Sequence, residues 1–342
     1  MLEVENILII HVSGRVGDTL LVTPVLETVR SYFKRANINF FVHRNTVDLV
    51  RNSPFVNHIS LFSKKSAKYK GWLSRKKYDL AIVVSGFYED DSETLIPYAC
   101  RVSHNIVAFK SPNSKLLNSC VHFQVDKNFN NKKHVIDYYH DLTNKLGMPI
   151  IGRRINFHSS KSELRKAHEL LQSSPLKACE LIIGVKITGL ASRSYRDWPT
   201  KNFLQLTNLL SKQYSKIGFI LLGGLNEYDK NEDIATSISA PVLNMSGEKL
   251  REIGAIMKYL DLYIGVDTGF TQLASSYDHP MVVLYHPSIP KHQSQPMNHP
   301  NFYSLECPKK LILDMNKEDM MATIDPEKVF EKINLALTGV MK

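Results

Sequence analysis

The stretch ILIIHVSGRVGDTLLVTPVL, residues 7–26, determines how the N-terminal part of the chain is expected to fold. Residues 7–12 form a nearly continuous apolar run, which is typical of a strand that lies in a parallel sheet and is covered on both faces. The run ends in a glycine-bearing turn, after which a helix is predicted to begin near Asp18. A strand that passes through a short turn into a helix indicates the first half of a βαβ unit.

The same alternation of apolar strands and helical stretches continues over most of the chain. The predicted strands cover residues 7–12, 39–42, 58–61, 80–84 and 105–109 in a first set, and residues 181–185, 218–222, 242–243, 262–264 and 281–284 in a second set. The clearest helical segments are residues 18–30, 135–146, 202–213 and 250–258. Such alternation indicates parallel sheets. The predicted class is therefore α/β, with two Rossmann-like doubly wound domains facing each other across a cleft.

The length of 342 residues exceeds the size at which a single hydrophobic core keeps growing, so two domains are expected. A polar, charged stretch near residues 150–175 interrupts the alternation and marks the connection between them. We expect an N-terminal domain at residues 1–165 and a C-terminal domain at residues 176–322. The remaining residues, 323–342, form a helical segment that is a candidate to pack back on the N-terminal domain.

Several features of the composition favour a cytoplasmic protein. The longest apolar runs are far shorter than the roughly 20 residues needed to span a bilayer. The first ten residues carry acids before their apolar run and lack the pattern of a secretory signal. The four cysteines are widely spaced, and no CxxC pair indicates a zinc site. We therefore expect reduced thiols, no bound metal and no other cofactor.

The chain is basic, with a formal net charge of +10. Part of the excess lies at residues 64–77, a segment that contains seven Lys or Arg residues and no acid. Such a segment suits an anionic lipid, an acidic saccharide or nucleic acid, or it is a solvated helix face. Because no nucleic-acid-binding motif or interleaved aromatic pattern accompanies it, nucleic acid is not an expected partner.

Two glycine-bearing turns that follow predicted strands are candidates for chemistry. Asp18 sits where the first helix begins, so its carboxylate is either a helix N-cap or a general base at the mouth of a cleft. The second turn, residues 265–269, reads GVDTG and leads into another helix. Free N–H groups at such a turn can hold a diphosphate, although Asp267 or Thr268 can equally act as a plain helix cap.

Two further segments carry weaker signals. The stretch ITGLASRSYRDWPTKNF, residues 187–203, contains Arg193 and Arg196, and arginine can hold phosphate oxygens with two hydrogen bonds. In LLGGLNEYDKNED, residues 221–233, Glu227 lies just beyond a predicted strand, where an acid can accept hydrogen bonds from a ribose diol. Taken alone, each of these residues is more typical of an ordinary surface position.

Taken in order, these segments resemble the ADP-heptose:lipopolysaccharide heptosyltransferase family. The order is S-x-x-x-G-D near the N-terminus, then a W-P segment, then G-G-x-x-E, then V-D-T-G-x-x-x-L-A. The resemblance covers roughly residues 6–60 and 180–290. Its most specific parts are the V-G-D-T-L-L-V-T-P-x-L stretch and the V-D-T-G stretch.

The resemblance implies a GT-B fold and the transfer of heptose from ADP-heptose to the inner core of lipopolysaccharide, onto a Kdo or heptose acceptor. The expected reaction is inverting and independent of metal, with the acceptor bound by the N-terminal domain and the nucleotide sugar by the C-terminal domain. The residues assigned on this basis are Asp18 as catalytic base, Lys186, Arg196, Glu227, Asp267, Thr268, Gly269 and Gln272 at the donor, and Ser13, Arg15, Lys64 and Lys65 at the acceptor.

The chain departs from the family pattern at several positions. Arg196 stands in the place of a family lysine, Gln272 in the place of a common histidine, and His286 where a Gly-Pro pair is usual. The expected partners are an ADP-heptose donor, an anionic lipid-linked saccharide acceptor and, peripherally, the inner face of the cell membrane.

Three alternatives to this function remain open at the level of sequence. The departures leave room for a transferase that uses another nucleotide sugar, for O-antigen or capsule. A homologue that binds a nucleotide sugar without catalysing transfer is a second alternative. A nicotinamide-dependent dehydrogenase is the third, but the first turn lacks the GxGxxG pattern that this class requires.

Overall fold

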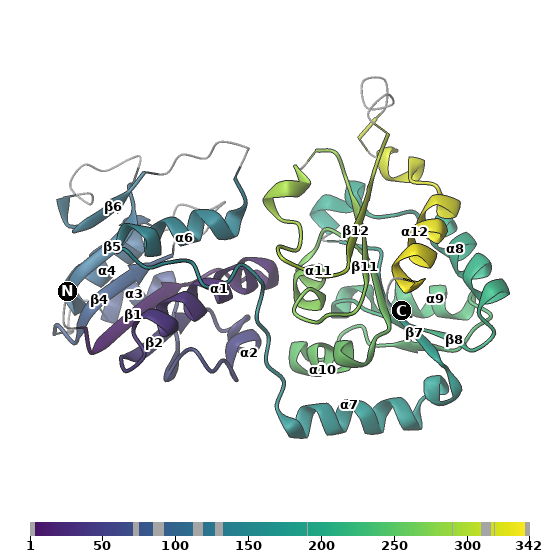
Figure 1. The fold of residues 1–342 in the computed structure, drawn as a ribbon, viewed down its shortest axis with the longest axis horizontal. Coiled ribbons are helices and arrows are strands. Elements are labelled where there is room, and N and C mark those ends of the chain that lie inside the picture. Colours follow the sequence, from purple (N-terminus) through teal and green to yellow (C-terminus); the bar gives the residue numbers. More distant parts are fainter. Residues whose placement is uncertain are drawn as a thin grey trace. The chain divides into compact units, whose positions relative to one another are not determined.

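The computed structural model describes residues 4–70, 75–84, 92–111, 119–126, 133–189, 191–288, 290–308, 316–317 and 319–338. The chain forms two compact units, residues 1–158 and residues 159–342 (Figure 1). The division falls between His158 and Ser159, ahead of the boundary expected at residue 165.

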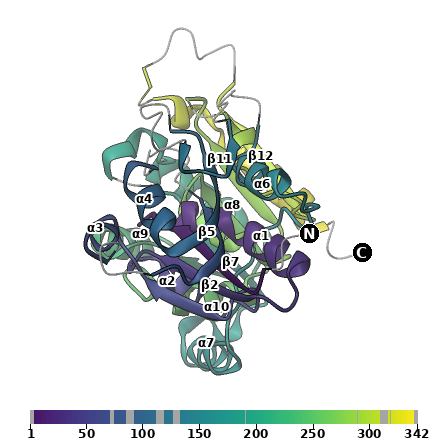
Figure 2. The ribbon, with the colours of Figure 1, turned by 90° about the vertical axis from the view of Figure 1, so that its left-hand side faces the viewer.

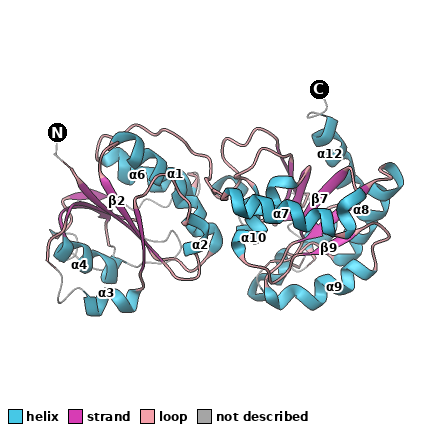
Figure 3. Ribbon diagram, turned by 90° about the horizontal axis from the view of Figure 1, so that it is seen from below, coloured by secondary structure: helices cyan, strands magenta, loops and turns pink. Residues whose placement is uncertain are grey.

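The N-terminal unit is built on a six-stranded parallel sheet in the order β3-β2-β1-β4-β5-β6. Figure 2 views this unit from its side and labels β2 and β5 of the sheet. Helices α1 and α6 pack together on one face of this sheet, and α3 and α4 pack together on the other (Figure 3). The strands are β1 (Asn6–His11), β2 (Asn37–Val42), β3 (His58–Leu61), β4 (Tyr78–Val83), β5 (Ser103–Phe109) and β6 (Phe123–Val125), and the helices are α1 (Val16–Tyr32), α2 (Val47–Val50), α3 (Lys64–Lys70), α4 (Ser92–Val102) and α6 (Val135–Lys145).

The C-terminal unit repeats this plan with a sheet in the order β12-β11-β10-β7-β8-β9, again parallel throughout. The strands are β7 (Leu181–Lys186), β8 (Ile217–Leu221), β9 (Val242–Asn244), β10 (Leu262–Val266), β11 (Met281–Tyr285) and β12 (Phe302–Glu306), and the helices are α7 (Lys161–Ser173), α8 (Thr200–Gln213), α9 (Tyr228–Thr236), α10 (Leu250–Ile256), α11 (Gly269–Ala274) and α12 (Pro326–Thr338).

Both sheets have the strand order of a Rossmann fold. Counted within its own unit, each sheet reads 3-2-1-4-5-6, so the direction of winding reverses between the first and fourth strands. These reversal points lie between β1 and β4 in the N-terminal unit and between β7 and β10 in the C-terminal unit. Ligands of such folds bind beyond the carboxyl ends of the strands at this point. The prediction of an α/β chain with two Rossmann-like doubly wound units is confirmed.

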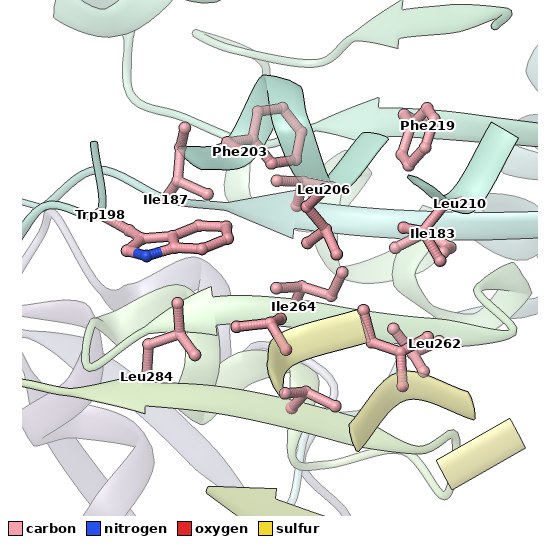
Figure 4. Close-up of a cluster of buried hydrophobic side chains, with 14 of the residues drawn as sticks. Ile183, Ile187, Trp198, Phe203, Leu206, Leu210, Phe219, Leu262, Ile264 and Leu284 are labelled. Carbon is pink, nitrogen blue, oxygen red and sulfur yellow. The ribbon is translucent and has the colours of Figure 1, made fainter. Parts of the chain in front are cut away.

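The core of the C-terminal unit explains where the last helix lies. Figure 4 shows Trp198, Phe203 and Phe219 among the aliphatic side chains of this core. Val329 and Ile333 of α12 are fully buried in the same cluster, and α12 packs on α8 and β11. Residues 323–342 were expected to be a candidate for packing on the N-terminal domain, whereas the apolar side of α12 is buried within the C-terminal unit.

Helix α7 opens the C-terminal unit and is tied to α10. Ser160 caps α7 in a reciprocal capping box with Glu163. Glu163 also pairs with the buried Arg251 guanidinium, with Oε1 at 2.8 Å from Nε. The hydrogen bond with Arg251 lowers the pKa of Glu163 to about 2. The polar stretch that the sequence places between the domains is therefore an anchored helix.

Two edge strands were not predicted. β6 has only three residues, and β12 lies in a stretch rich in Pro, His and Asn that reads as irregular. Both pair with one neighbour only, so they lack the continuous apolar pattern of central strands. Among the described residues, no helix is long and apolar enough to cross a membrane, and no three His, Cys, Asp or Glu side chains form a metal-binding group.

Candidate functional site

Two predicted donor-binding residues lie at the reversal point of the C-terminal sheet. Lys186 is the last residue of β7, and Asp267 directly follows β10, the strand that pairs with β7. Because the two strands are parallel neighbours, their carboxyl ends bring both side chains to the same edge of the sheet. This is the edge at which Rossmann folds bind nucleotides.

Lys186 is buried, and its ammonium group is held inside the protein. Its Nζ lies 2.5 Å from Glu227 Oε1, 2.5 Å from the Thr188 carbonyl oxygen and 2.9 Å from Thr188 Oγ1. Burial lowers the pKa of Lys186, while the nearby Glu227 carboxylate opposes this shift. A buried ammonium group needs such partners, because an unpaired charge in the interior is strongly destabilising.

Glu227 joins three segments of the site. It ends a single 3₁₀ turn, Leu225–Glu227, that follows β8. Its Oε2 accepts a hydrogen bond from the Gly224 N–H at 2.8 Å, while its Oε1 receives Lys186 and the Thr188 hydroxyl. Glu227 therefore occupies the place beyond the second strand of the unit where an acid meets a ribose in related folds.

Asp267 lies under the influence of two arginines. Its carboxylate accepts a hydrogen bond from Ser294 Oγ, which is 3.3 Å from Oδ1. Burial raises the pKa of Asp267, and the positive charges of Arg196 and Arg193 counteract part of this shift. The structure thus brings both arginines of the W-P segment into electrostatic contact with the turn that follows β10.

Arg196 is poised for a further contact. Its guanidinium lies 5.5 Å from the centre of the Tyr195 ring, and Lys317 Nζ lies 3.9 Å from the same ring centre. The Nε atom of Arg196 is buried and has no hydrogen-bond partner among the described residues. Arg196 and Lys317 thus form a cationic group around Tyr195, and Arg193 joins Arg196 in acting on Asp267. Such a group suits a phosphate or diphosphate.

The other residues predicted to bind the donor at this turn lie in α11 or at its N-cap. Thr268 is the N-cap residue of α11, and Gly269 is its first residue, so the backbone N–H groups of the first turn begin here. Gln272 is buried, and its Nε2 donates to the Ser294 carbonyl oxygen at 2.5 Å. The structure gives the Gln272 amide a partner inside the protein, where the sequence predicted a contact with the donor.

His286, the other departure from the family pattern, has a structural environment. Its Nδ1 accepts from the Ser288 backbone N–H at 3.0 Å, and its Nε2 lies 3.0 Å from the Lys317 carbonyl oxygen. The ring also meets Tyr195 edge to face, with the centres 5.0 Å apart. His286 therefore fixes the backbone of the residue whose ammonium group lies over Tyr195.

In the N-terminal unit, the first turn carries Asp18 as the sequence predicts. Asp18 lies in the first turn of α1 and is half-buried, and its Oδ2 accepts a hydrogen bond from Ser13 Oγ at 2.9 Å. The N-cap of α1 is Arg15, whose side chain makes no capping hydrogen bond. Asp18 therefore does not serve as the N-cap of α1, although its position in the first turn suits the helix dipole.

The remaining acceptor assignments are distributed over two elements. Ser13 and Arg15 share the turn with Asp18, and the Arg15 N–H donates to Ser13 Oγ at 3.2 Å. Lys64 and Lys65 are exposed at the start of α3. The side chains of Lys68 and Lys70, in the same basic run, lie outside the described residues.

Thr188 and Ser294 were missed by sequence reasoning. Thr188 could have been found from the sequence, because it is a polar residue just after an apolar strand. Ser294 could not, since it reaches Asp267 from a loop that is distant in sequence. Only the folded chain brings Thr188 to Glu227 and Ser294 to Asp267.

Comparison with known proteins identifies the chain's relatives. The family model described as glycosyltransferase family 9 (heptosyltransferase) matches residues 67–316. Lipopolysaccharide heptosyltransferase 3 of Escherichia coli K12 is 20% identical over 286 residues, which cover 79% of each chain.

Two solved structures share the whole architecture. The glycosyltransferase family 9 protein of Veillonella parvula superposes with a TM-score of 0.81 at 17% identity, covering 98% of each chain. The Escherichia coli ADP-heptose lipopolysaccharide heptosyltransferase II superposes with a TM-score of 0.77 at 16% identity, covering 98% of this chain and all of that one. At these identities, the likeness establishes the fold.

Proposed function

Because the chain belongs to glycosyltransferase family 9, the heptosyltransferase family, we propose that it transfers a heptose from ADP-heptose to the lipopolysaccharide inner core. The observation that carries this proposal is the grouping of Lys186, Glu227 and Asp267 at the reversal point of the C-terminal sheet, with Arg193 and Arg196 beside them. An acid placed for a ribose and cations placed for a diphosphate are what a nucleotide sugar requires.

The proposed reaction is a single displacement. The Asp18 carboxylate takes the proton of an acceptor hydroxyl as that oxygen bonds to the anomeric carbon of the donor. The bond from the anomeric carbon to the diphosphate breaks, and ADP departs with the electron pair. One displacement inverts the anomeric configuration, through a transition state with oxocarbenium character.

Charge on the departing diphosphate is stabilised by the C-terminal unit. Arg196, whose Nε has no partner among the described residues, can bind a phosphate oxygen, and Arg193 adds to the field at the same turn. The protein's own cations thus supply the neutralisation that the leaving group needs, and the proposed reaction is independent of metal. Transfer that persists in excess EDTA is the expected result, and abolition by EDTA contradicts this part of the proposal.

The proposed acceptor is an anionic, lipid-linked saccharide containing Kdo or heptose. Ser13, Arg15 and the exposed Lys64 and Lys65 are the residues proposed to meet it. Their charges also suit the anionic inner face of the cell membrane, where we place the protein as a peripheral, cytoplasmic enzyme.

The proposed function is tested by transfer from defined donors. The purified protein is given a Kdo-lipid acceptor or its heptosylated form with ADP-heptose, ADP-glucose, UDP-glucose or GDP-mannose, and products are identified by mass spectrometry. We expect one added heptose, from ADP-heptose only, with inverted anomeric configuration by NMR. A hexose added from a UDP or GDP donor favours the alternative transferase, and tight donor binding without product favours an inactive homologue.

A further inference from the structure

The ammonium group of Lys186 has no hydrogen left for a ligand. An ammonium group has three N–H donors, and the three oxygens around Nζ are Glu227 Oε1, Thr188 O and Thr188 Oγ1, at 2.5, 2.5 and 2.9 Å. The side chain is only 3% exposed. Lys186 therefore acts on Glu227 and Thr188, where the sequence had assigned it to the donor itself.

Glu227, by contrast, keeps part of its carboxylate accessible. Its Oε1 is occupied by Lys186 and the Thr188 hydroxyl, and its Oε2 accepts the Gly224 N–H at 2.8 Å. Since each carboxylate oxygen has two acceptor positions, these contacts leave one position on Oε2. The side chain of Glu227 is 20% exposed, so a small polar group can reach it.

The charge of Lys186 matters for what can bind there. Glu227 lies beyond the second strand of the unit, the place at which related folds accept a ribose hydroxyl. A nucleoside diphosphate brings further negative charge to the same edge of the sheet. An unneutralised carboxylate would repel that charge, whereas the buried ammonium group cancels it and fixes the rotamer of Glu227.

We propose that Lys186 is a positioning residue that neutralises Glu227 and aims its free Oε2 at a ribose hydroxyl of the bound nucleotide. This inference rests on the proposed function. In this inference, the protein discriminates between nucleotides by their ribose hydroxyl through two residues, Lys186 and Glu227. Only Glu227 contacts the ligand.

The test compares the dissociation constants of ADP, 2′-deoxy-ADP and 3′-deoxy-ADP by calorimetry. We expect wild-type protein to bind at least one deoxy analogue about 10-fold more weakly than ADP, the size expected for one hydrogen bond to a charged group. In Lys186→Met this ratio should fall toward 1, because Glu227 loses the ammonium group that neutralises it and pairs with Oε1. A merely structural role of Lys186 would weaken all three nucleotides equally and leave the ratio unchanged.

Lys216→Met is the matched control, since Lys216 pairs with Glu180 on the surface and the same substitution should leave the ratio at its wild-type value. If Lys186→Met does not fold, Lys186→Leu carries the same test, because it also removes both the charge and the hydrogen-bond donor. A folded Lys186 variant that keeps the wild-type ratio overturns the inference but not the proposed function. The same holds if the wild-type protein itself has a ratio of 1. Failure of wild-type protein to bind ADP overturns the proposed function, and the inference with it.

Discussion

Arg196 is the residue whose surroundings most directly suggest a ligand. Burial raises the pKa of Asp267, and the positive charge of Arg196 counteracts part of this rise. The Arg196 Nε is buried and has no partner among the described residues. A buried polar atom of this kind is costly unless something binds it. A phosphate oxygen of the donor would satisfy it.

Replacing Arg196 by Met should therefore weaken donor binding. We expect the KM for the nucleotide sugar to rise about 10- to 100-fold, because a hydrogen bond to a charged group contributes about 1.5–3 kcal/mol. Arg196→Lys should recover part of this loss, since lysine keeps the charge but not the planar geometry. Steady-state kinetics with the exposed Arg165→Met as control provide the measurement, and an unchanged KM in Arg196→Met would refute the assignment.

The candidate site was predictable from sequence where a residue lies near the carboxyl end of a strand. Lys186 ends β7, Asp267 directly follows β10, and Asp18 lies in the first turn of the helix after β1. Residues at the carboxyl ends of parallel strands are where such folds bind ligands. What these side chains contact could not be predicted. The pairing of Lys186 with Glu227 and the link from Gln272 to Ser294 join residues far apart in sequence, so they depend on the packed structure.

At the scale of elements, one ion pair ties α7 to α10. Arg251 is only 6% exposed, and Glu163 both caps α7 and pairs with this guanidinium. Removing the carboxylate charge breaks this ion pair of the buried cation. Helix α7 begins the C-terminal unit, so this pair fixes the first element of that unit on α10.

Glu163→Gln should lower the free energy of unfolding by about 3 kcal/mol, the lower end of the range for breaking a buried ion pair. The pKa of Glu163 is lowered from 4.5 to about 2, so this stabilisation is complete above pH 4.5 and is lost as the pH falls toward 2. Urea unfolding of the wild type and of Glu163→Gln between pH 3 and 8 measures this difference in the free energy of unfolding. The exposed control, Glu169→Gln, should change stability by about 0.5 kcal/mol or less. A difference between wild type and Glu163→Gln that does not shrink below pH 4.5 would argue against the ion pair.

Central elements were more predictable than peripheral ones. The strands β1, β7, β8, β10 and β11 are buried on both faces and read as apolar runs. The edge strands β6 and β12 are partly exposed and carry no such pattern, so they were missed. The position of α12 was also not predictable, because an apolar helix face does not identify the surface that covers it.

At the scale of the whole molecule, the net charge of +10 and the basic run at residues 64–77 predict binding to anionic membranes. We expect the protein to sediment with vesicles containing phosphatidylglycerol at low salt and to be released at about 0.5 M NaCl, because salt screens such contacts. Lys64→Glu combined with Lys65→Glu should reduce binding, whereas Lys166→Glu combined with Lys177→Glu, the same charge change elsewhere, should reduce it less. Binding that is unaffected by salt would exclude this mode of attachment.

The two units have separate tasks in the proposed reaction, with the base on the N-terminal unit and the donor contacts on the C-terminal unit. The most direct test of this division measures ADP affinity and heptose transfer on the same preparation of Asp18→Asn. We predict an unchanged dissociation constant for ADP and a kcat at least about 100-fold lower, because a general base contributes 10²–10⁴-fold. Transfer at the wild-type rate, or loss of ADP binding in this variant, would contradict it.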